Sequence, residues 1–206
     1  AHADDDFSKN KSIAELTDWN IYSPVWAPVS LEDQWLKLQD KDPFDYAKVE
    51  RKIPASKELK VSFDLKAGQN NKGTLQIEFL DENGIACSRM ELTDDGIFRL
   101  KGGSRFANMM KYEAGKVYHV EAVLSTVDRN IQVYVDGKRV GLRMFYAPVA
   151  AVERIVFRTG VPRTFPTVDT PADQTYDLPD AGAQDPLAEY GIANVKTSSA
   201  DKDASS

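Results

Sequence analysis

The sequence predicts an all-β fold, a two-layer antiparallel β-sandwich of the jelly-roll type. Three observations support this prediction. Apolar and polar residues alternate along several short segments, turn-forming stretches rich in glycine separate these segments, and no window of a dozen residues keeps helical spacing. About ten such segments follow one another at the short, regular spacing that is typical of a sandwich.

The clearest strand covers residues 58–66, where apolar and polar side chains alternate without a break. The Asn83–Gly84 pair supplies the positive φ that a tight hairpin turn requires. The other predicted strands, in chain order, are 74–80, 85–92, 97–101, 116–124, 130–135, 153–158 and 190–196. Residues 147–153 could form a turn of helix.

Two segments interrupt the alternation, and both ends of the chain are small and polar. Residues 19–35 contain all three tryptophans, and residues 161–186 form a stretch rich in proline and aspartate. A loop of that length is either functional or strapped across a surface. The composition predicts a flexible N-terminal tail at 1–11, a sandwich domain at 12–197 and a flexible C-terminal tail at 198–206.

Composition limits the classes of partner. The 206 residues are 42% hydrophobic, which is sufficient for the core of one sandwich, and the formal net charge is −6. Without a basic cluster, this charge disfavours nucleic acid and anionic membrane surfaces as partners. No stretch is long and apolar enough to insert into a membrane, and the first residues lack a signal peptide, as expected of a mature secreted chain or a domain of a larger protein.

Cys87 is the only cysteine, so the chain can form neither an internal disulfide nor a cysteine-based zinc site. Its flanking residues belong to a predicted strand. We therefore expect a buried and inert thiol.

Three motifs carry a resemblance to a known fold family. The segments YHVEAVL at 118–124 and NIQVYVDGK at 130–138, followed by IANVK at 192–196, resemble strands of laminin-G and concanavalin A-like domains. A wider resemblance links IYSPVWAPV at 21–29, DKDPFDY at 40–46, MKYEAG at 110–115 and the stretch from Arg158 to Pro179 to accessory sandwich domains of large secreted Bacteroidetes glycan-degrading enzymes. Some of those domains are paired with sialidase-like β-propellers.

This resemblance implies a non-catalytic carbohydrate-binding or accessory module of a secreted polysaccharide-degrading enzyme. The implied partners are a polysaccharide or oligosaccharide and a catalytic domain in the same parent chain. The implied location is secreted, periplasmic or at the outer surface of a bacterium. One alternative is a purely structural domain that buttresses a catalytic neighbour, and another is a sandwich-fold polysaccharide lyase or glycoside hydrolase.

Catalysis is disfavoured, and no catalytic residue is assigned. The E-x-D-x-x-E spacing of sandwich glycosidases is absent from the sequence. Residues 89–92 and 112–118 are similar to two alginate-lyase strands, but Glu78 stands where such a lyase needs histidine, and the strand order is reversed. His119 lies beside Val120 without a plausible partner, so a structural role is expected for it.

The candidate ligand-binding residues are aromatic side chains, which stack on sugar rings, and polar or cationic side chains, which bind hydroxyl and acidic groups. They are Trp26, Trp35, Tyr112, Tyr146, Arg105, Asn108, Arg158 and Arg163. The alternative for each is a place in the core or a solvated surface position.

No cofactor is required by the sequence, but a structural Ca²⁺ is possible. Asp169, Asp173 and Asp177 are spaced so that a folded loop could bring their oxygens together. Alternatively, these aspartates cap turns in a proline-rich loop.

Overall fold

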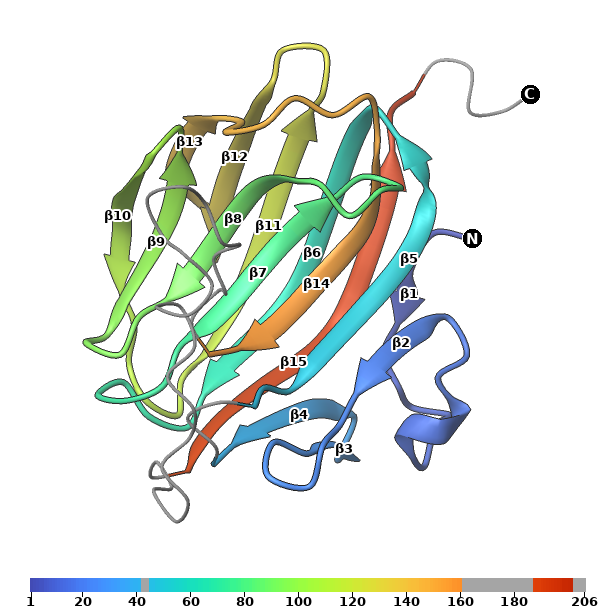
Figure 1. Ribbon diagram of the computed structural model, residues 1–206, viewed down its shortest axis with the longest axis vertical. Coiled ribbons are helices and arrows are strands. Elements are labelled where there is room, and N and C mark those ends of the chain that lie inside the picture. Colours follow the sequence, from blue (N-terminus) through green and yellow to red (C-terminus); the bar gives the residue numbers. More distant parts are fainter. Residues whose placement is uncertain (42–44, 161–186, 202–206) are drawn as a thin grey trace, which may run out of the picture.

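The computed structural model describes residues 1–41, 45–160 and 187–201. In this part of the chain all regular elements are strands, except for the 3₁₀ helix η1 (Ile13–Glu15). The strands form two antiparallel sheets that lie one in front of the other (Figure 1). The predicted two-layer antiparallel β-sandwich is therefore confirmed.

The strands of each sheet pair side by side in an order that differs from their order along the chain. In spatial order, sheet A consists of β13 (Lys138–Met144), β12 (Asn130–Val135), β11 (Val117–Ser125), β6 (Glu58–Ala67), β15 (Ala188–Ser199), β4 (Trp35–Asp40) and β3 (Val29–Glu32), with β1 (Asp4–Asp5) also paired to β15. Sheet B consists of β10 (Arg105–Lys111), β9 (Ile97–Gly102), β8 (Ala86–Leu92), β7 (Leu75–Leu80), β14 (Val152–Thr159), β5 (Lys48–Ser56) and β2 (Trp19–Tyr22).

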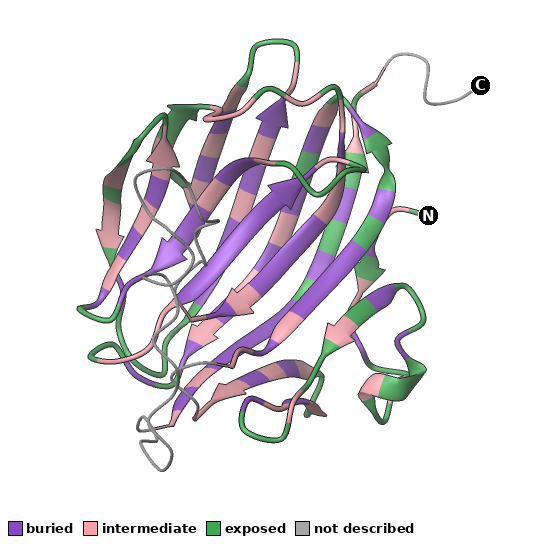
Figure 2. Cartoon of the chain, viewed as in Figure 1, coloured by how far each residue is buried: buried purple, intermediate pink, exposed green. Residues whose placement is uncertain are grey.

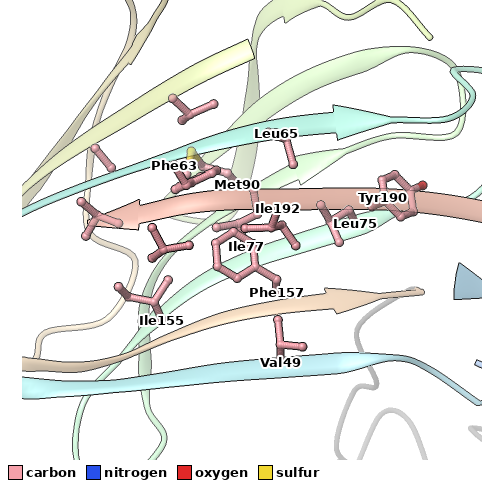
Figure 3. Packing of buried hydrophobic residues seen from close by; sticks show 14 of the residues in the cluster. Val49, Phe63, Leu65, Leu75, Ile77, Met90, Ile155, Phe157, Tyr190 and Ile192 are labelled. Carbon is pink, nitrogen blue, oxygen red and sulfur yellow. The ribbon is translucent and has the colours of Figure 1, made fainter. Parts of the chain in front are cut away.

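The core lies between the sheets and follows from the period-two pattern. Along β6, Leu59, Val61, Phe63 and Leu65 are buried, whereas the residues between them are not fully buried (Figure 2). Side chains from both sheets meet in the space between them (Figure 3). The rings of Phe63 and Phe157 pack edge to face with their centroids 5.0 Å apart, so aromatic contact joins the two layers.

Strand β7 departs from this pattern because it is buried on both faces. Leu75, Ile77 and Phe79 face the core, but Gln76 and Glu78, which point to the outer face of sheet B, are buried as well. Buried polar groups need partners. The outer face of sheet B is therefore a candidate functional surface.

The N-terminal residues differ from the predicted flexible tail at 1–11. Asp4 and Asp5 pair with Lys196 and Val195 of β15, and Phe7 is part of the hydrophobic core. The strand Asp4–Asp5 has two polar residues, so it shows no alternation of apolar and polar side chains from which a strand could be predicted. Pairing with the exposed edge of a neighbouring strand orders them.

The C-terminal boundary also shifts. Strand β15 runs to Ser199, and the Asp201 carboxylate accepts hydrogen bonds from the backbone N–H groups of Lys57 and Glu58. Residues 198–201 thus belong to the sandwich rather than to the predicted tail, whose remainder at 202–206 lies outside the described residues. The possible helical turn at 147–153 does not form, because residues 147–151 are irregular and β14 begins at Val152.

Two expectations about composition can be compared with the structure. Cys87 is free and buried, and burial raises its pKa to about 12, which confirms the prediction of a buried thiol. Within the described ranges, no helix has the length and apolarity needed to span a membrane.

Candidate functional site

The outer face of sheet B carries a layer of charged and amide side chains that we call the polar face. Alternation places these side chains outward, because their strand neighbours Ile77, Met90 and Phe157 point into the core. The register places them side by side across four strands. The members are Gln76 and Glu78 on β7, Arg89 and Glu91 on β8, Arg99 on β9 and Arg158 on β14.

The two carboxylates of the polar face are paired with arginines. Arg89 Nη2 lies 3.1 Å from Glu78 Oε2, and Arg99 Nε donates to Glu91 Oε1 at 2.8 Å. The other Glu91 oxygen accepts a hydrogen bond of 2.6 Å from Gln76 Nε2. Since isolated buried charges are costly, this pairing is what allows Glu78 and Glu91 to be buried on an outward face.

Tyr146, in the segment between β13 and β14, packs beside this layer. The Lys101 ammonium lies 4.5 Å from the centroid of its ring, and the Arg89 guanidinium carbon lies at 5.9 Å. Burial raises the pKa of Tyr146 to about 12, so its hydroxyl keeps its proton at neutral pH. Burial, and then the charge of Arg89, lowers the pKa of Lys101.

Two further contacts between arginines and aromatic rings lie on the same sheet. The Arg99 guanidinium carbon lies 4.1 Å from the centroid of Phe106 on β10, and that of Arg158 lies 5.4 Å from the centroid of Tyr46. These rings hold the planar arginine heads in defined positions.

Several polar atoms here have no hydrogen-bond partner in the described structure. Of the seven buried side-chain atoms of this kind, four belong to the polar face and to Tyr146: Gln76 Oε1, Arg89 Nε, Tyr146 Oη and Arg158 Nε. Each unmade hydrogen bond costs about 1–3 kcal/mol. Two guanidinium N–H groups and an amide oxygen on strands β8, β14 and β7, and the hydroxyl of Tyr146 in the β13–β14 segment, are thus buried without a hydrogen-bond partner in the described part of the chain.

The structure brings four of the predicted ligand-binding residues to this sheet. Tyr146 and Arg158 are at the polar face, and Asn108 pairs in register with Arg99 from the exposed part of β10. Arg105 begins β10 and is exposed.

The remaining predicted residues lie elsewhere. Tyr112 is buried and its hydroxyl donates to the Thr93 carbonyl, so its assignment to a binding surface is wrong. Trp26 is 49% exposed in the loop between β2 and β3, and Trp35 lies on the outer face of sheet A.

The predicted metal ligands Asp169, Asp173 and Asp177, together with Arg163, lie outside the described residues. Within the ranges that the structure does describe, no group of three His, Cys, Asp or Glu side chains could hold a metal ion. The calcium site stays a prediction.

Sequence reasoning missed most of the polar face. Gln76 and Glu78 sit at outward positions of their strand, which normally face solvent, and cross-strand pairing with Glu91 and Arg89 is invisible in a single sequence. The available signal was the opposite charge of Glu78 and Arg89 on two strands joined by a predicted hairpin. The expectation that His119 has no partner is also wrong, because its Nδ1 atom lies 2.9 Å from Asp64 Oδ1 on the neighbouring strand.

Comparison with known proteins supplies the family context. The model of a family described as "Sialidase-like, CBM domain", where CBM denotes a carbohydrate-binding module, matches residues 19–174. A solved sialidase of Bacteroides is 88% identical over 100% of this chain, with a TM-score of 0.93, and this chain spans 19% of the length of that sialidase. None of the curated proteins compared with the chain matches it.

More distant structures share the fold. The carbohydrate-binding module CBM66 from Bacillus subtilis is 11% identical with a TM-score of 0.53, and the match covers 89% of this chain and 96% of the module. The alginate lyase AlgAT5, of polysaccharide lyase family 7, is 12% identical with a TM-score of 0.55, and the match covers 89% of this chain and 95% of the lyase.

Proposed function

Because the chain belongs to the family of sialidase-like CBM domains, we propose that it binds an acidic glycan through the polar face of sheet B and performs no catalysis itself. It is similar over its whole length to a part of a sialidase. We further propose that its partner in a longer parent chain is a catalytic domain, as in that relative.

The observation that carries the proposal is the group of four buried, unpartnered polar atoms on and beside the polar face. These atoms have almost no contact with solvent, so their side chains would shift to meet a ligand, and their chemistry defines the ligand. The Nε–H groups of Arg89 and Arg158 and the Tyr146 hydroxyl can donate to carboxylate and hydroxyl oxygens, while Gln76 Oε1 can accept from a hydroxyl.

The charge of the site favours an acid over a neutral sugar. Arg89, Arg99, Arg158 and Lys101 supply four positive charges, and Glu78 and Glu91 supply two negative charges, so these side chains leave two positive charges uncompensated. A sialylated glycan, which the name of the relative suggests, offers one carboxylate and several hydroxyls.

Three features support the absence of catalysis. Both carboxylates of the polar face are already bound by arginines. The tyrosines of the alginate-lyase-like segment are structural, since Tyr112 is buried against Thr93 and the Tyr118 hydroxyl accepts the N–H of Glu113. The two histidines bond to Thr197 and Asp64, away from the polar face. General acid–base catalysis needs a free, positioned group.

The proposed location is outside the cytoplasm, in the periplasm, at the outer surface or in the medium. Polymeric and cell-surface glycans are found there, and a module that holds an enzyme on such a glycan has to reach it.

Isothermal titration calorimetry of the 206-residue chain with methyl α-sialoside and methyl β-galactoside tests the proposal. We expect binding of the sialoside at the polar face, and about tenfold weaker binding by Tyr146→Phe, which removes a single hydroxyl. Arg158→Lys keeps the charge but removes Nε–H, and should also weaken binding. Arg139→Lys, on the exposed strand β13, is the matched control.

If all three variants bind the sialoside with the affinity of the unchanged chain, the ligand binds somewhere other than the polar face. If neither sugar gives binding heat, and longer acidic and neutral glycans give none either, the proposal is overturned. A structural domain that buttresses a neighbour is then favoured. Release of free sialic acid from a sialoside by the chain alone would contradict the non-catalytic role.

A further inference from the structure

The outer face of sheet A, on the opposite side of the sandwich from the polar face, contains a pocket of about 400 Å³. Two acidic residues at the β3–β4 turn, side chains of β4 and β6, and the start of β15 line it. The lining includes the side chains of Glu32, Asp33, Trp35, Lys37, Lys66 and Glu189. Its volume lies within the range that small-molecule sites occupy.

Trp35 forms the floor of this pocket. It points outward because its neighbour Leu36 is fully buried in the core. Its indole rests on Gly191 of β15, where an added Cβ would come within 3.0 Å of Trp35 Cε3. The absence of a side chain at Gly191 thus lets the ring lie against the backbone of the sheet, which leaves the ring few ways to move.

A fixed aromatic ring is suited to stacking on the C–H face of a sugar, because it gives a large contact area at a small entropic cost. The residues around Trp35 add hydrogen-bonding groups at its rim. Lys66 Nζ lies over the indole, 4.8 Å from its centroid, in a cation–π contact, so this ammonium must move to the edge of the ring when a sugar stacks there. No ion pair with a carboxylate engages Lys66 within the described ranges, so its ammonium keeps donors for ligand hydroxyls.

Lys37 and the carboxylates form the other side of the rim. Lys37 Nζ lies 3.1 Å from Glu32 Oε2 and 3.7 Å from Glu189 Oε1. The hydrogen bond from Lys37 to Glu32 raises the pKa of Lys37. Glu189 Oε1 is also fixed by Gln39 Nε2 at 2.7 Å. The pocket therefore presents anchored acceptors and donors next to the aromatic floor.

We propose that this pocket is a second carbohydrate site, which takes one pyranose ring of a neutral glycan. Trp35 stacks on the ring, Lys66 donates to ring or hydroxyl oxygens, and Glu32 and Glu189 accept from hydroxyls. Three carboxylates, including that of Asp33, stand against two lysines, so the lining has one net negative charge and disfavours an anionic sugar.

This inference goes beyond the polar face and does not depend on it. The two sites use different sheets, different side chains and ligands of different charge. One domain could thus hold an acidic sugar on one face and a neutral sugar on the other.

Nuclear magnetic resonance of the indole N–H groups tests the proposal. The chain has three tryptophans in distinct settings: Trp19 is buried with its Nε1 bonded to Asp5, Trp26 is exposed, and Trp35 lines the pocket. On titration with methyl β-galactoside or methyl β-glucoside, we expect a saturable shift of the Trp35 signal, assigned with Trp35→Phe. The Trp26 and Trp19 signals should stay in place.

Two variants probe the floor of the pocket. Trp35→Ala should weaken binding of the methyl glycoside about tenfold. Gly191→Ala keeps the indole but sets a methyl group against Trp35 Cε3, so the ring must give way by a few tenths of an ångström, and binding should weaken without the loss of any functional group. Trp26→Ala, another exposed tryptophan outside the pocket, should bind like the unchanged chain. Thermal melts establish that each variant folds.

The outcomes separate this proposal from the previous one. A lack of any saturable Trp35 shift, or equal shifts of Trp26 and Trp35, would overturn the second site whatever the polar face does. Conversely, Tyr146→Phe should leave the neutral site unchanged, and Trp35→Ala should leave the affinity for methyl α-sialoside unchanged.

Discussion

Asp5 and Arg51 form an ion pair between the first strand of the chain and β5, with Asp5 Oδ2 2.8 Å from Arg51 Nε. The same carboxylate oxygen accepts a hydrogen bond from the Trp19 indole. Arg51 is only 3% exposed, so Asp5 neutralises a buried cation. One aspartate in the first few residues thus joins β1, β2 and β5, which belong to both sheets.

Replacement of Asp5 should therefore destabilise the whole sandwich. We expect Asp5→Ala to lower the free energy of unfolding by about 3 kcal/mol, because Arg51 would remain buried without its partner. Urea denaturation followed by fluorescence measures this. Asp4→Ala, on the exposed neighbour, should change stability by less than about 0.5 kcal/mol. A similar small change for Asp5→Ala would show that Asp18, 3.9 Å from Arg51, takes over the pairing.

Asp201 should make the stability depend on pH. Burial acts to raise the pKa of this carboxyl, but the N–H groups of Lys57 and Glu58 outweigh it and the pKa is lowered. A lowered folded-state pKa means that the stabilisation is present above the unfolded pKa, near 4, and is lost as pH falls through the folded value.

Asp201→Ala should consequently reduce stability by at most about 1 kcal/mol at pH 7, since the group is largely solvated. The difference from the unchanged chain should shrink and then vanish as pH falls through the lowered folded-state pKa, in urea titrations at a series of pH values. Lys57→Ala keeps the backbone donor and is the control. A difference that persists at low pH would mean that the carboxylate is not the source.

Cys87 should be unreactive in the folded protein. With its pKa raised to about 12, only about one thiol in ten thousand is ionised at pH 8, and the side chain is also fully buried. Mass spectrometry after treatment with iodoacetamide should show no modification of the native chain and complete modification in guanidinium chloride. Rapid labelling under native conditions would show that β8 opens locally.

The β3–β4 turn should tolerate, and benefit from, a glycine. Asp33 and Gln34 both have positive φ, 50° and 69°, as the two central residues of a type I′ turn require. Gln34→Gly removes the steric cost of a side chain at that φ, and we expect a gain of about 0.5 kcal/mol after the entropy of the unfolded chain is subtracted.

Differential scanning calorimetry would show this gain as a rise in Tm of one to two degrees or so. Ser30→Gly, at a position of β3 without positive φ, should lower Tm instead. A fall in Tm for Gln34→Gly would mean that the Gln34 side chain makes a contact worth more than the strain.

A strand could be predicted from the sequence where one of its faces is exposed to solvent and the other is buried. Strand β6 is of this kind, and its alternation fixed its position and its inward residues. Strand β5 does not alternate cleanly, because Arg51 points inward to meet Asp5, and it also contains Pro54. The inward position of Arg51 is explained by its ion pair with Asp5, a contact that the pattern of β5 alone does not reveal.

The site was less predictable for a related reason. Tyr146 and Arg158 could be proposed from residue type alone, but Tyr112, of the same type as Tyr146, turned inward to bond with Thr93. Whether Glu78 is solvated or paired with Arg89 depends on strand register, and a single sequence does not encode register in a readable form.

The position of β15 has a consequence for synthesis on the ribosome. This strand is the last of the described elements, yet it lies between β6 and β4 and also carries β1. The described strands of sheet B have all been made by Thr159, but sheet A stays in separate pieces until β15 emerges. Until then the edge of β6 that pairs with β15 has no hydrogen-bond partner strand, and cotranslational folding should reach completion in one late step.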